Sequence, residues 1–193
     1  MEYLQKKIRR ILEIYGLHSI ARRYFIINSF DGIILVLSIF LIFFISGYFS
    51  RILIIKTVLA ASFGASLSGF IGAYFSEISE RKHYRKKYEK LLLRSLKGSI
   101  IQKYEKYAAI LMGLIEGLSP MIFAIFALLP IFLIPDIILS ILFGMLICIF
   151  EIIFLGYFLS NIAGERKIET ILKLLFISIV LTFVIVFLDI FIK

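Results

Sequence analysis

The amino-acid sequence predicts an all-α membrane protein with five transmembrane helices. Hydrophobic residues make up 61% of the 193-residue chain, and the mean hydropathy is +1.02. Water-soluble domains contain only roughly 45–50% apolar residues, so this composition excludes a soluble fold. Charged residues gather into three blocks and leave apolar runs of about 20 residues, the length that crosses a hydrocarbon core of about 30 Å.

Five apolar runs are the predicted spans. They cover residues 24–46, 52–76, 108–134, 137–160 and 171–190. Together they form one membrane domain over residues 24–193, with a charged connector over residues 77–107 between the second and third spans. The first run follows 23 residues and has no small-residue cleavage site, so we expect a retained helix rather than a removed signal peptide.

The distribution of lysine and arginine predicts the orientation. The segment before Tyr24 holds six of these residues, the connector holds ten and residues 161–173 hold three. The opposite side holds only Arg51, Lys56 and Lys193. Because cytoplasmic flanks carry an excess of basic residues, we expect a cytoplasmic N-terminus and a C-terminus outside. No organelle-targeting signal is visible, so the expected location is the cell membrane, and the net charge of +9 does not indicate nucleic-acid binding.

The segment over residues 1–23 is predicted to be a basic amphipathic helix. Its apolar residues recur at helical spacing and its basic residues occupy much of the remainder. The apolar set is Leu4, Ile8, Ile11, Leu12 and Tyr15. We expect this helix to lie on membrane lipid at the inner interface, against anionic headgroups. A solvated charged tail is the alternative interpretation.

The helical pattern of the second span continues into the connector. An apolar side is formed there by Tyr84, Tyr88, Leu91, Leu92 and Ser95. Gly98 is expected to end this helix, and Ser99 followed by Gln102 has the spacing of a capping box that starts the next one. A short cytoplasmic helical hairpin is therefore predicted between the second and third spans.

Small residues line one side of the second span. They are Ser62, Ala65, Ser66, Gly69, Gly72, Ala73 and Ser76. Small side chains let another helix approach closely in a membrane. We therefore expect the second span to lie at a tightly packed centre.

Three carboxylates interrupt the apolar spans. Asp31, Glu116 and Glu151 lie eight or nine residues from the inner ends of their spans, about 12–14 Å deep at 1.5 Å per residue. Such groups cost ~2.5–3.5 kcal/mol on insertion scales, so they mark a protein interior or a water-filled path. With no basic residue at that depth, a cluster of the three favours a bound cation or a shared proton. The alternative is that each acid is protonated and hydrogen-bonded separately.

The third span carries further features around Glu116. Pro120 lacks an N–H and cannot donate to the Glu116 carbonyl, and carbonyl oxygens at helix breaks coordinate ions in transporters. Gly113 and Gly117 are expected to leave room for an ion. Met112, one turn before Glu116, offers a soft thioether ligand suited to a transition metal, with apolar packing as the alternative role.

Two further acids in the connector are candidates for gathering metal. Glu77 and Glu80 share a helix face at i and i+3, although salt bridges to the surrounding basic residues are the alternative role. The chain has no phosphate-binding glycine loop, no H-E-x-x-H and no G-x-S-x-G motif, so neither an enzymatic activity nor a permanently bound cofactor is expected.

Several segments resemble the vacuolar iron transporter family. Asn28-Ser29-Phe30-Asp31-Gly32 is similar to the family's first-span start, Gly64 to Ser76 to its small-residue second span, Phe75 to Arg81 to the exit from that span, Leu128-Leu129-Pro130 to the third-span ending, and Leu155 to Gly164 to the fourth-span exit. The resemblance implies a five-span homodimer that moves ferrous iron or manganese out of the cytosol, in some members by exchange for protons. It also implies that Asp31 is a metal ligand. The family's second-span glutamate falls at Ala73, with Glu77 one turn later.

We therefore expect a homodimeric divalent-cation transporter in which Asp31, Glu116 and Glu151 line a path. The transported metal, iron or manganese, is cargo rather than a resident cofactor. A non-transporting membrane scaffold, which binds lipid or a partner through its N-terminal helix and its hairpin, is the alternative class. A transporter of another cation or a small solute is the third.

Overall fold

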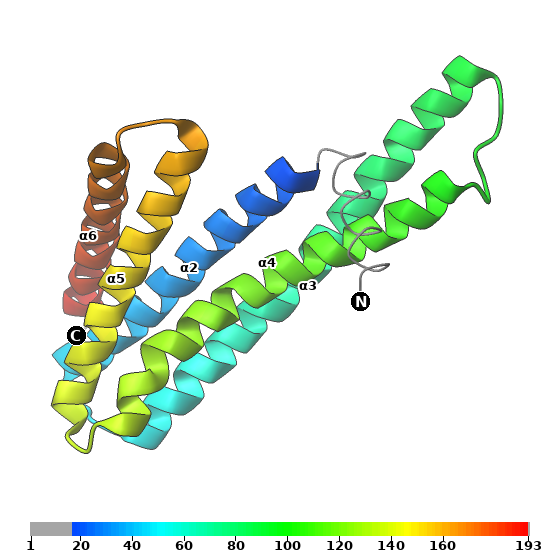
Figure 1. Ribbon diagram of the computed structural model, residues 1–193. Coiled ribbons are helices and arrows are strands. Elements are labelled where there is room, and N and C mark those ends of the chain that lie inside the picture. The colour runs from blue at the N-terminus through cyan, green and yellow to red at the C-terminus, as the bar shows by residue number, and fades with distance from the viewer. Residues whose placement is uncertain (1–16, 193) are drawn as a thin grey trace. The chain divides into compact units, whose positions relative to one another are not determined.

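A computed structural model describes residues 17–192, and every regular element within them is an α-helix (Figure 1). The helices are α2 (Leu17–Ser46), α3 (Arg51–Leu92), α4 (Ile100–Leu133), α5 (Ile137–Ala163) and α6 (Lys167–Ile192). Each of these five is long and apolar enough to cross a membrane, which confirms the all-α, five-helix prediction. Residues 1–16 of the predicted amphipathic helix lie outside the described residues, and its last part, residues 17–23, begins α2.

Capping residues set the ends of the apolar helices. Gly47 and Gly164 follow α2 and α5 in the left-handed conformation, both with φ of +68°, which glycine adopts without a steric penalty. The Gly164 N–H donates to the Ser160 carbonyl at 2.9 Å. At the other end of α5, the Asp136 carboxylate accepts the Leu139 N–H at 2.9 Å, as an N-cap does.

Arg51, at the start of α3, caps the end of α4. Its guanidinium donates to the carbonyls of Ile131, Ile134 and Pro135, the last two at 2.8 and 2.6 Å. The last carbonyls of a helix have no partner within the helix, and a cation there also complements the helix dipole. One side chain therefore joins the two helix ends at this side of the protein.

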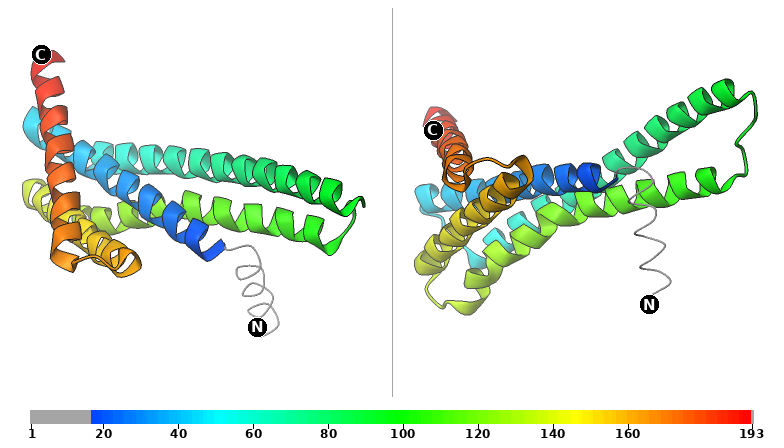
Figure 2. Two further views of the ribbon diagram at one scale, coloured as in Figure 1. Left: turned by 90° about the horizontal axis from the view of Figure 1, so that it is seen from above. Right: turned by 45° about the horizontal axis from the view of Figure 1, so that its top comes forward.

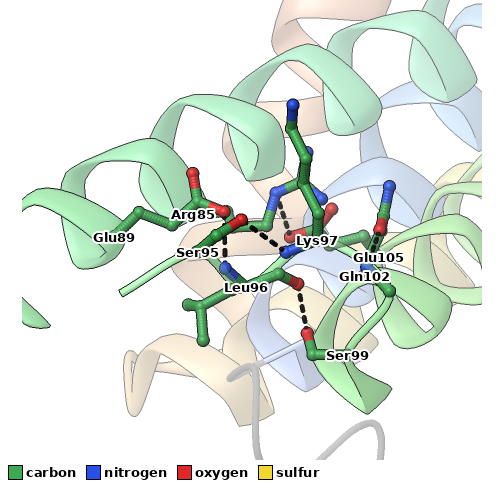
Figure 3. A network of polar contacts seen from close by, with 9 residues as sticks. Arg85, Glu89, Ser95, Leu96, Lys97, Ser99, Gln102 and Glu105 are labelled. Carbon is green, nitrogen blue, oxygen red and sulfur yellow. Dashed lines mark hydrogen bonds and ion pairs between the residues drawn. The ribbon is translucent and has the colours of Figure 1, made fainter. Parts of the chain in front are cut away.

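The end of α3 differs from the prediction, because the helix stops well before Gly98. The Arg94 N–H donates to the Glu89 carbonyl at 3.3 Å, and Leu93 has φ of +49°. This bond from C″ to C3 is a Schellman motif, with leucine at the C′ position that glycine usually occupies. The Glu89 carboxylate accepts the Leu96 N–H at 2.7 Å (Figure 3). A local cap built on Glu89 therefore ends the helix before the glycine is reached.

The predicted reciprocal capping box at the start of α4 is also wrong in detail. Gln102 Oε1 accepts the N–H of Gly98 at 2.7 Å, one residue before the expected partner. The Ser99 hydroxyl donates to the Leu96 carbonyl at 2.6 Å (Figure 3). The glutamine reaches further back than predicted, and the serine hydroxyl is used as a donor in the turn rather than as an acceptor for the helix.

The chain forms two compact units. The first contains the start of α2 up to Phe25 together with Ser66–Leu118, which are the second part of α3 and the first part of α4. The second contains Ile26–Ala65 and Ser119–Lys193, and so includes α5 and α6. Each unit has its own packing, which is described separately below.

Glycines of α4 let α3 approach closely in the first unit, where the two helices run side by side (Figures 1 and 2). A Cβ on Gly117 would lie 2.7 Å from the Ser66 carbonyl oxygen, and one on Gly113 would lie 2.9 Å from that of Phe70. Small residues spaced by four are a common contact between membrane helices. The prediction that these glycines leave room for an ion is therefore wrong, because the α3 backbone fills the space.

Replacing Gly117 with alanine is expected to lower the free energy of unfolding by about 1–3 kcal/mol, because the added methyl would overpack against backbone that cannot swing away. Gly72→Ala is the matched control, since a Cβ there meets nothing within 4 Å and alanine is favoured over glycine in a helix by up to about 1 kcal/mol. Denaturant unfolding in mild detergent measures both. Equal stability of the two variants would contradict the packing.

Glycines also mark the helix crossings of the second unit. A Cβ on Gly32 of α2 would lie 2.5 Å from Pro120 Cα in α4, and one on Gly144 of α5 would lie 3.1 Å from the Ala127 carbonyl oxygen in α4. The Phe40 ring of α2 covers Gly144 as well. A Cβ on Gly156 would lie 2.9 Å from Cα of Ile171, where α5 meets α6. Helices α2, α4 and α5 therefore share one packed core, to which α6 is added through α5.

Glu165 organises the link between α5 and α6. Its Oε2 accepts hydrogen bonds from Lys173 Nζ at 3.3 Å and from Thr170 Oγ1 at 3.2 Å. The hydrogen bond from Lys173, followed by that from Thr170, holds the pKa of the Glu165 carboxyl below its ordinary value of 4.5. The ionised carboxylate therefore contributes to the stability of this link.

We expect the wild type to resist heat better than Glu165→Gln at neutral pH. A group with a lowered folded-state pKa stabilises fully above its unfolded-state pKa, and that contribution is lost as the pH falls through the folded-state value. The difference in midpoint temperature should stay constant above the ordinary glutamate pKa of 4.5 and shrink below it. Thermal unfolding across this range measures it, and a difference that grows in acid would contradict the assignment.

Candidate functional site

Asp31 lies on the exposed side of α2 in the protomer. The buried face of the helix is formed by Ser29, Ile33, Val36 and Phe40, and Asp31 is exposed. Two residues turn an α-helix by about 200°, so Asp31 points away from the face that begins at Ser29. The Asp31 carboxylate therefore lies on the outer surface of the protomer.

Glu151 has the opposite environment, because it lies on the buried face of α5. Only 8% of the residue is exposed, and neither carboxylate oxygen has a hydrogen-bond partner among the described residues. Gly144 of α5 meets Ala127 of α4. Glu151 lies two helical turns after Gly144, and Pro120 lies two turns before Ala127. Since α4 and α5 run in opposite directions, Glu151 lies near the level of Pro120. Gly32 of α2 packs against Pro120 at that level.

Glu116 and Met112 lie in the first unit on neighbouring turns of α4. Glu116 is half-buried beside α3, where a Cβ on Gly69 would lie 3.3 Å from its Cγ. Met112 is fully buried in an apolar cluster with Leu17 and Ala108. The Met112 side chain of α4, predicted as a possible metal ligand, therefore packs against Leu17 at the start of α2.

Glu77 and Glu80 have different environments although they are close in sequence. Glu77 is 2% exposed, accepts a hydrogen bond from Arg81 Nη2 at 2.6 Å and accepts another from the Tyr24 hydroxyl at 3.3 Å. Glu80 is exposed. The salt-bridge role that was the alternative for this pair holds for Glu77, but the ion pair is buried rather than solvated.

A second buried ion pair joins α3 to α4 in the first unit. Arg85 Nε lies 3.6 Å from Glu105 Oε1, and each side chain is only 9% exposed (Figure 3). The buried face of α3 thus continues from the small residues of the apolar part to Glu77, Arg81 and Arg85. The pair of Arg85 with Glu105 thus joins α3 to α4 by charge in this segment.

The predicted ligands do not form one compact metal centre in the described residues. No group of three or more His, Cys, Asp or Glu side chains is placed there to hold a metal ion. Asp31 and Glu151 belong to the second unit and Glu116 to the first. A path shared by these three carboxylates stays a prediction.

Sequence reasoning missed the hydroxyl of Tyr24 and the pairing of Glu77 with Arg81. The pairing of Glu77 with Arg81 had a signal in the sequence, because acidic and basic residues at i and i+4 are neighbours on a helix. The hydrogen bond from Tyr24 to Glu77 had no such signal, since 53 residues separate the two. The same holds for Arg85 and Glu105, which lie on different helices.

Comparison of the chain with protein families, with curated proteins and with solved structures found no match. The resemblance to the vacuolar iron transporter family rests on the motifs quoted above. The functional argument that follows therefore depends on the carboxylates within the apolar helices and on their surroundings.

Proposed function

We propose that this protein is a homodimeric transporter that moves a divalent cation, ferrous iron or manganese, out of the cytosol. The observation that carries the proposal is Asp31, a carboxylate in the apolar part of α2 that is exposed on the protomer. In hydrocarbon it would cost ~2.5–3.5 kcal/mol on insertion scales. A second copy of the chain covering this face of α2 would remove that cost and enclose the carboxylate in a path.

Glu116 and Glu151 supply the remaining charge of the proposed path. Carboxylate oxygens suit manganese, and a ferrous ion accepts them as well. Glu151 is buried without a hydrogen-bond partner in the described residues, and a carboxylate in such surroundings favours its protonated form. A cation can bind only after the proton leaves. Exchange of the metal for protons follows from this competition.

The metal selectivity of the flux tests this function. The purified protein in proteoliposomes is expected to carry iron and manganese across the bilayer faster than empty vesicles do, with calcium and magnesium as the comparison ions. A proton gradient directed opposite to the metal movement should drive the metal flux. Absence of flux with all four ions would contradict transport and favour the membrane scaffold that uses the basic hairpin.

The proposed direction of transport depends on topology. We propose that the segment joining α3 to α4 is a cytoplasmic hairpin, that the N-terminal segment lies on the inner membrane surface, and that the C-terminus is outside the cell membrane. Lysine and arginine counts support this orientation.

Cysteine labelling from each side of the membrane tests the topology. Single cysteines at Lys97 and Arg166 are expected to react only from the cytoplasmic side, and those at Arg51 and Asp136 only from outside. The native Cys148 is fully buried, so it should not contribute to labelling of the folded protein. Labelling of position 97 from outside would overturn both the orientation and the direction of transport.

A further inference from the structure

An apolar stripe is exposed where α3 extends beyond its apolar part. It consists of Tyr84, Tyr88, Leu91, Leu92 and Leu93, whose exposure ranges from 51% at Tyr84 to 94% at Leu93. These residues lie in the charged segment over residues 77–107, which is too polar to face hydrocarbon. We call this set the tyrosine–leucine stripe. Unlike the exposed apolar residues of the spans, it is not explained by contact with lipid tails.

The packing of α3 leaves the stripe uncovered. In this segment the structure buries Arg81 and Arg85 and exposes Tyr84 and Tyr88. The buried ion pairs with Glu77 and Glu105 make this arrangement possible. The apolar side of an amphipathic helix is therefore turned outward.

Leu93 strengthens the case that the stripe contacts something outside the chain. Its backbone has φ of +49°, a conformation that costs a residue with a Cβ roughly 1–2 kcal/mol and that glycine adopts freely. With 94% of Leu93 exposed, packing against the described residues does not offset the strain. Neither the fold of the turn nor the core accounts for a leucine at this position.

The segment that carries the stripe is rich in exposed positive charge. Eight exposed basic residues lie on the same segment, namely Lys82, Lys86, Lys87, Lys90, Arg94, Lys97, Lys103 and Lys106. Of the four acids there, Glu77 and Glu105 are buried in ion pairs, and Glu89 bonds the turn after α3. Only Glu80 is left exposed. Charge complementarity favours an anionic surface as the partner and disfavours a second copy of the same stripe.

We infer that the tyrosine–leucine stripe is a docking site for the surface of an anionic bilayer. Leucine side chains can enter the boundary between headgroups and acyl chains, and tyrosine is enriched at the headgroup level. Each lysine near an anionic surface adds about 1 kcal/mol of attraction. The tyrosine–leucine stripe supplies the apolar side chains, and the exposed lysines of the same segment supply the positive charge.

The bilayer that the stripe binds is not the one that the helices span. Leu92 lies sixteen residues beyond Ser76, the end of the predicted second span, and α3 is continuous between them. The rise is about 24 Å along the helix, whereas the headgroup layer on each side is only about 5–8 Å thick. At a tilt of about 20° the leucines still stand about 22 Å from the hydrocarbon of their own bilayer. The docking therefore tethers a second membrane.

Vesicle capture by the full-length protein tests this inference. The protein in nanodiscs of neutral lipid is mixed with vesicles of phosphatidylcholine plus phosphatidylglycerol, or of phosphatidylcholine alone, and the bound fraction is measured by flotation. Wild type is expected to bind the anionic vesicles and not the neutral ones. Replacing Leu91, Leu92 and Leu93 together with serine should weaken binding at least about tenfold, and Lys86, Lys87 and Lys90 with glutamine about a hundredfold.

Matched variants isolate the stripe from the rest of the chain. The pair Phe132→Ser and Leu133→Ser removes equally exposed apolar side chains at the opposite end of α4 and should bind like wild type. Methionine at 91, 92 and 93 keeps apolar area and should restore binding, which excludes misfolding as the cause of the loss. Binding that survives the serine variant, equal binding to neutral vesicles, or no capture of anionic vesicles would each overturn the inference.

Discussion

Replacing Asp31 with asparagine is expected to lower divalent-cation flux in proteoliposomes at least about tenfold, equivalent to ~1.4 kcal/mol of lost interaction. The substitution keeps the size of the side chain and its capacity for hydrogen bonds, but removes the ionised oxygens that attract a cation. Because Asp31 is exposed on the protomer, asparagine should not disturb the core of α2. Expression and dimer content should therefore stay near wild type.

Asp136→Asn is the matched control for this experiment. Asp136 caps the start of α5 by accepting the Leu139 N–H, and asparagine serves as an N-cap about as well as aspartate. The same chemical change is thus made outside the apolar part of the chain, where flux should not respond. Full activity of Asp31→Asn would remove the site assignment and the strongest reason to propose a metal transporter.

Replacing Glu77 with alanine is expected to lower the free energy of unfolding by about 3–5 kcal/mol. The substitution takes the carboxylate away from Arg81, which is 8% exposed, and loss of one partner from a buried ion pair leaves an uncompensated charge. It also removes the acceptor of the Tyr24 hydroxyl. Denaturant unfolding in mild detergent, followed by circular dichroism, measures the change.

Two comparisons separate this structural role of Glu77 from a role in gathering metal. Glu80→Ala removes an exposed acid one turn away and should change stability by no more than about 0.5 kcal/mol. The double variant Glu77→Leu with Arg81→Leu replaces both charges by apolar groups and should recover most of the lost stability. A Glu77→Ala protein as stable as Glu80→Ala would show that the ion pair contributes little.

The five apolar helices could be predicted because hydrophobic length is a requirement of the bilayer and does not depend on tertiary contacts. The end of α3 could not, because the competition between Gly98 and the cap at Glu89 is decided by a side-chain hydrogen bond to Leu96. The buried side of α3 beyond its apolar part was not predicted. Periodicity identifies an apolar side, but the ion pair of Arg85 with Glu105 decided which side faces α4.

The candidate site was predictable only in part. Asp31, Glu116 and Glu151 stand out in the sequence because charge is rare in apolar runs, but their exposure depends on helix rotation. Buried Glu151 and exposed Asp31 differ for that reason alone. The enclosure of Met112 by Leu17 and Ala108 depends on where α2 begins to pack, which no spacing in the sequence reveals.

The glycine contacts and the ion pair between α3 and α4 together prevent the two helices from sliding. A shift by one turn, about 5.4 Å, would place either Ala109 against Phe70 or Met121 against Ser66, so one of the two glycine contacts would be lost. The same shift would pull Glu105 out of reach of Arg85. The glycine contacts set how closely the two helices approach, and the ion pair fixes their alignment along the helix axes. These parts of α3 and α4 should therefore move together as one rigid body during any conformational change.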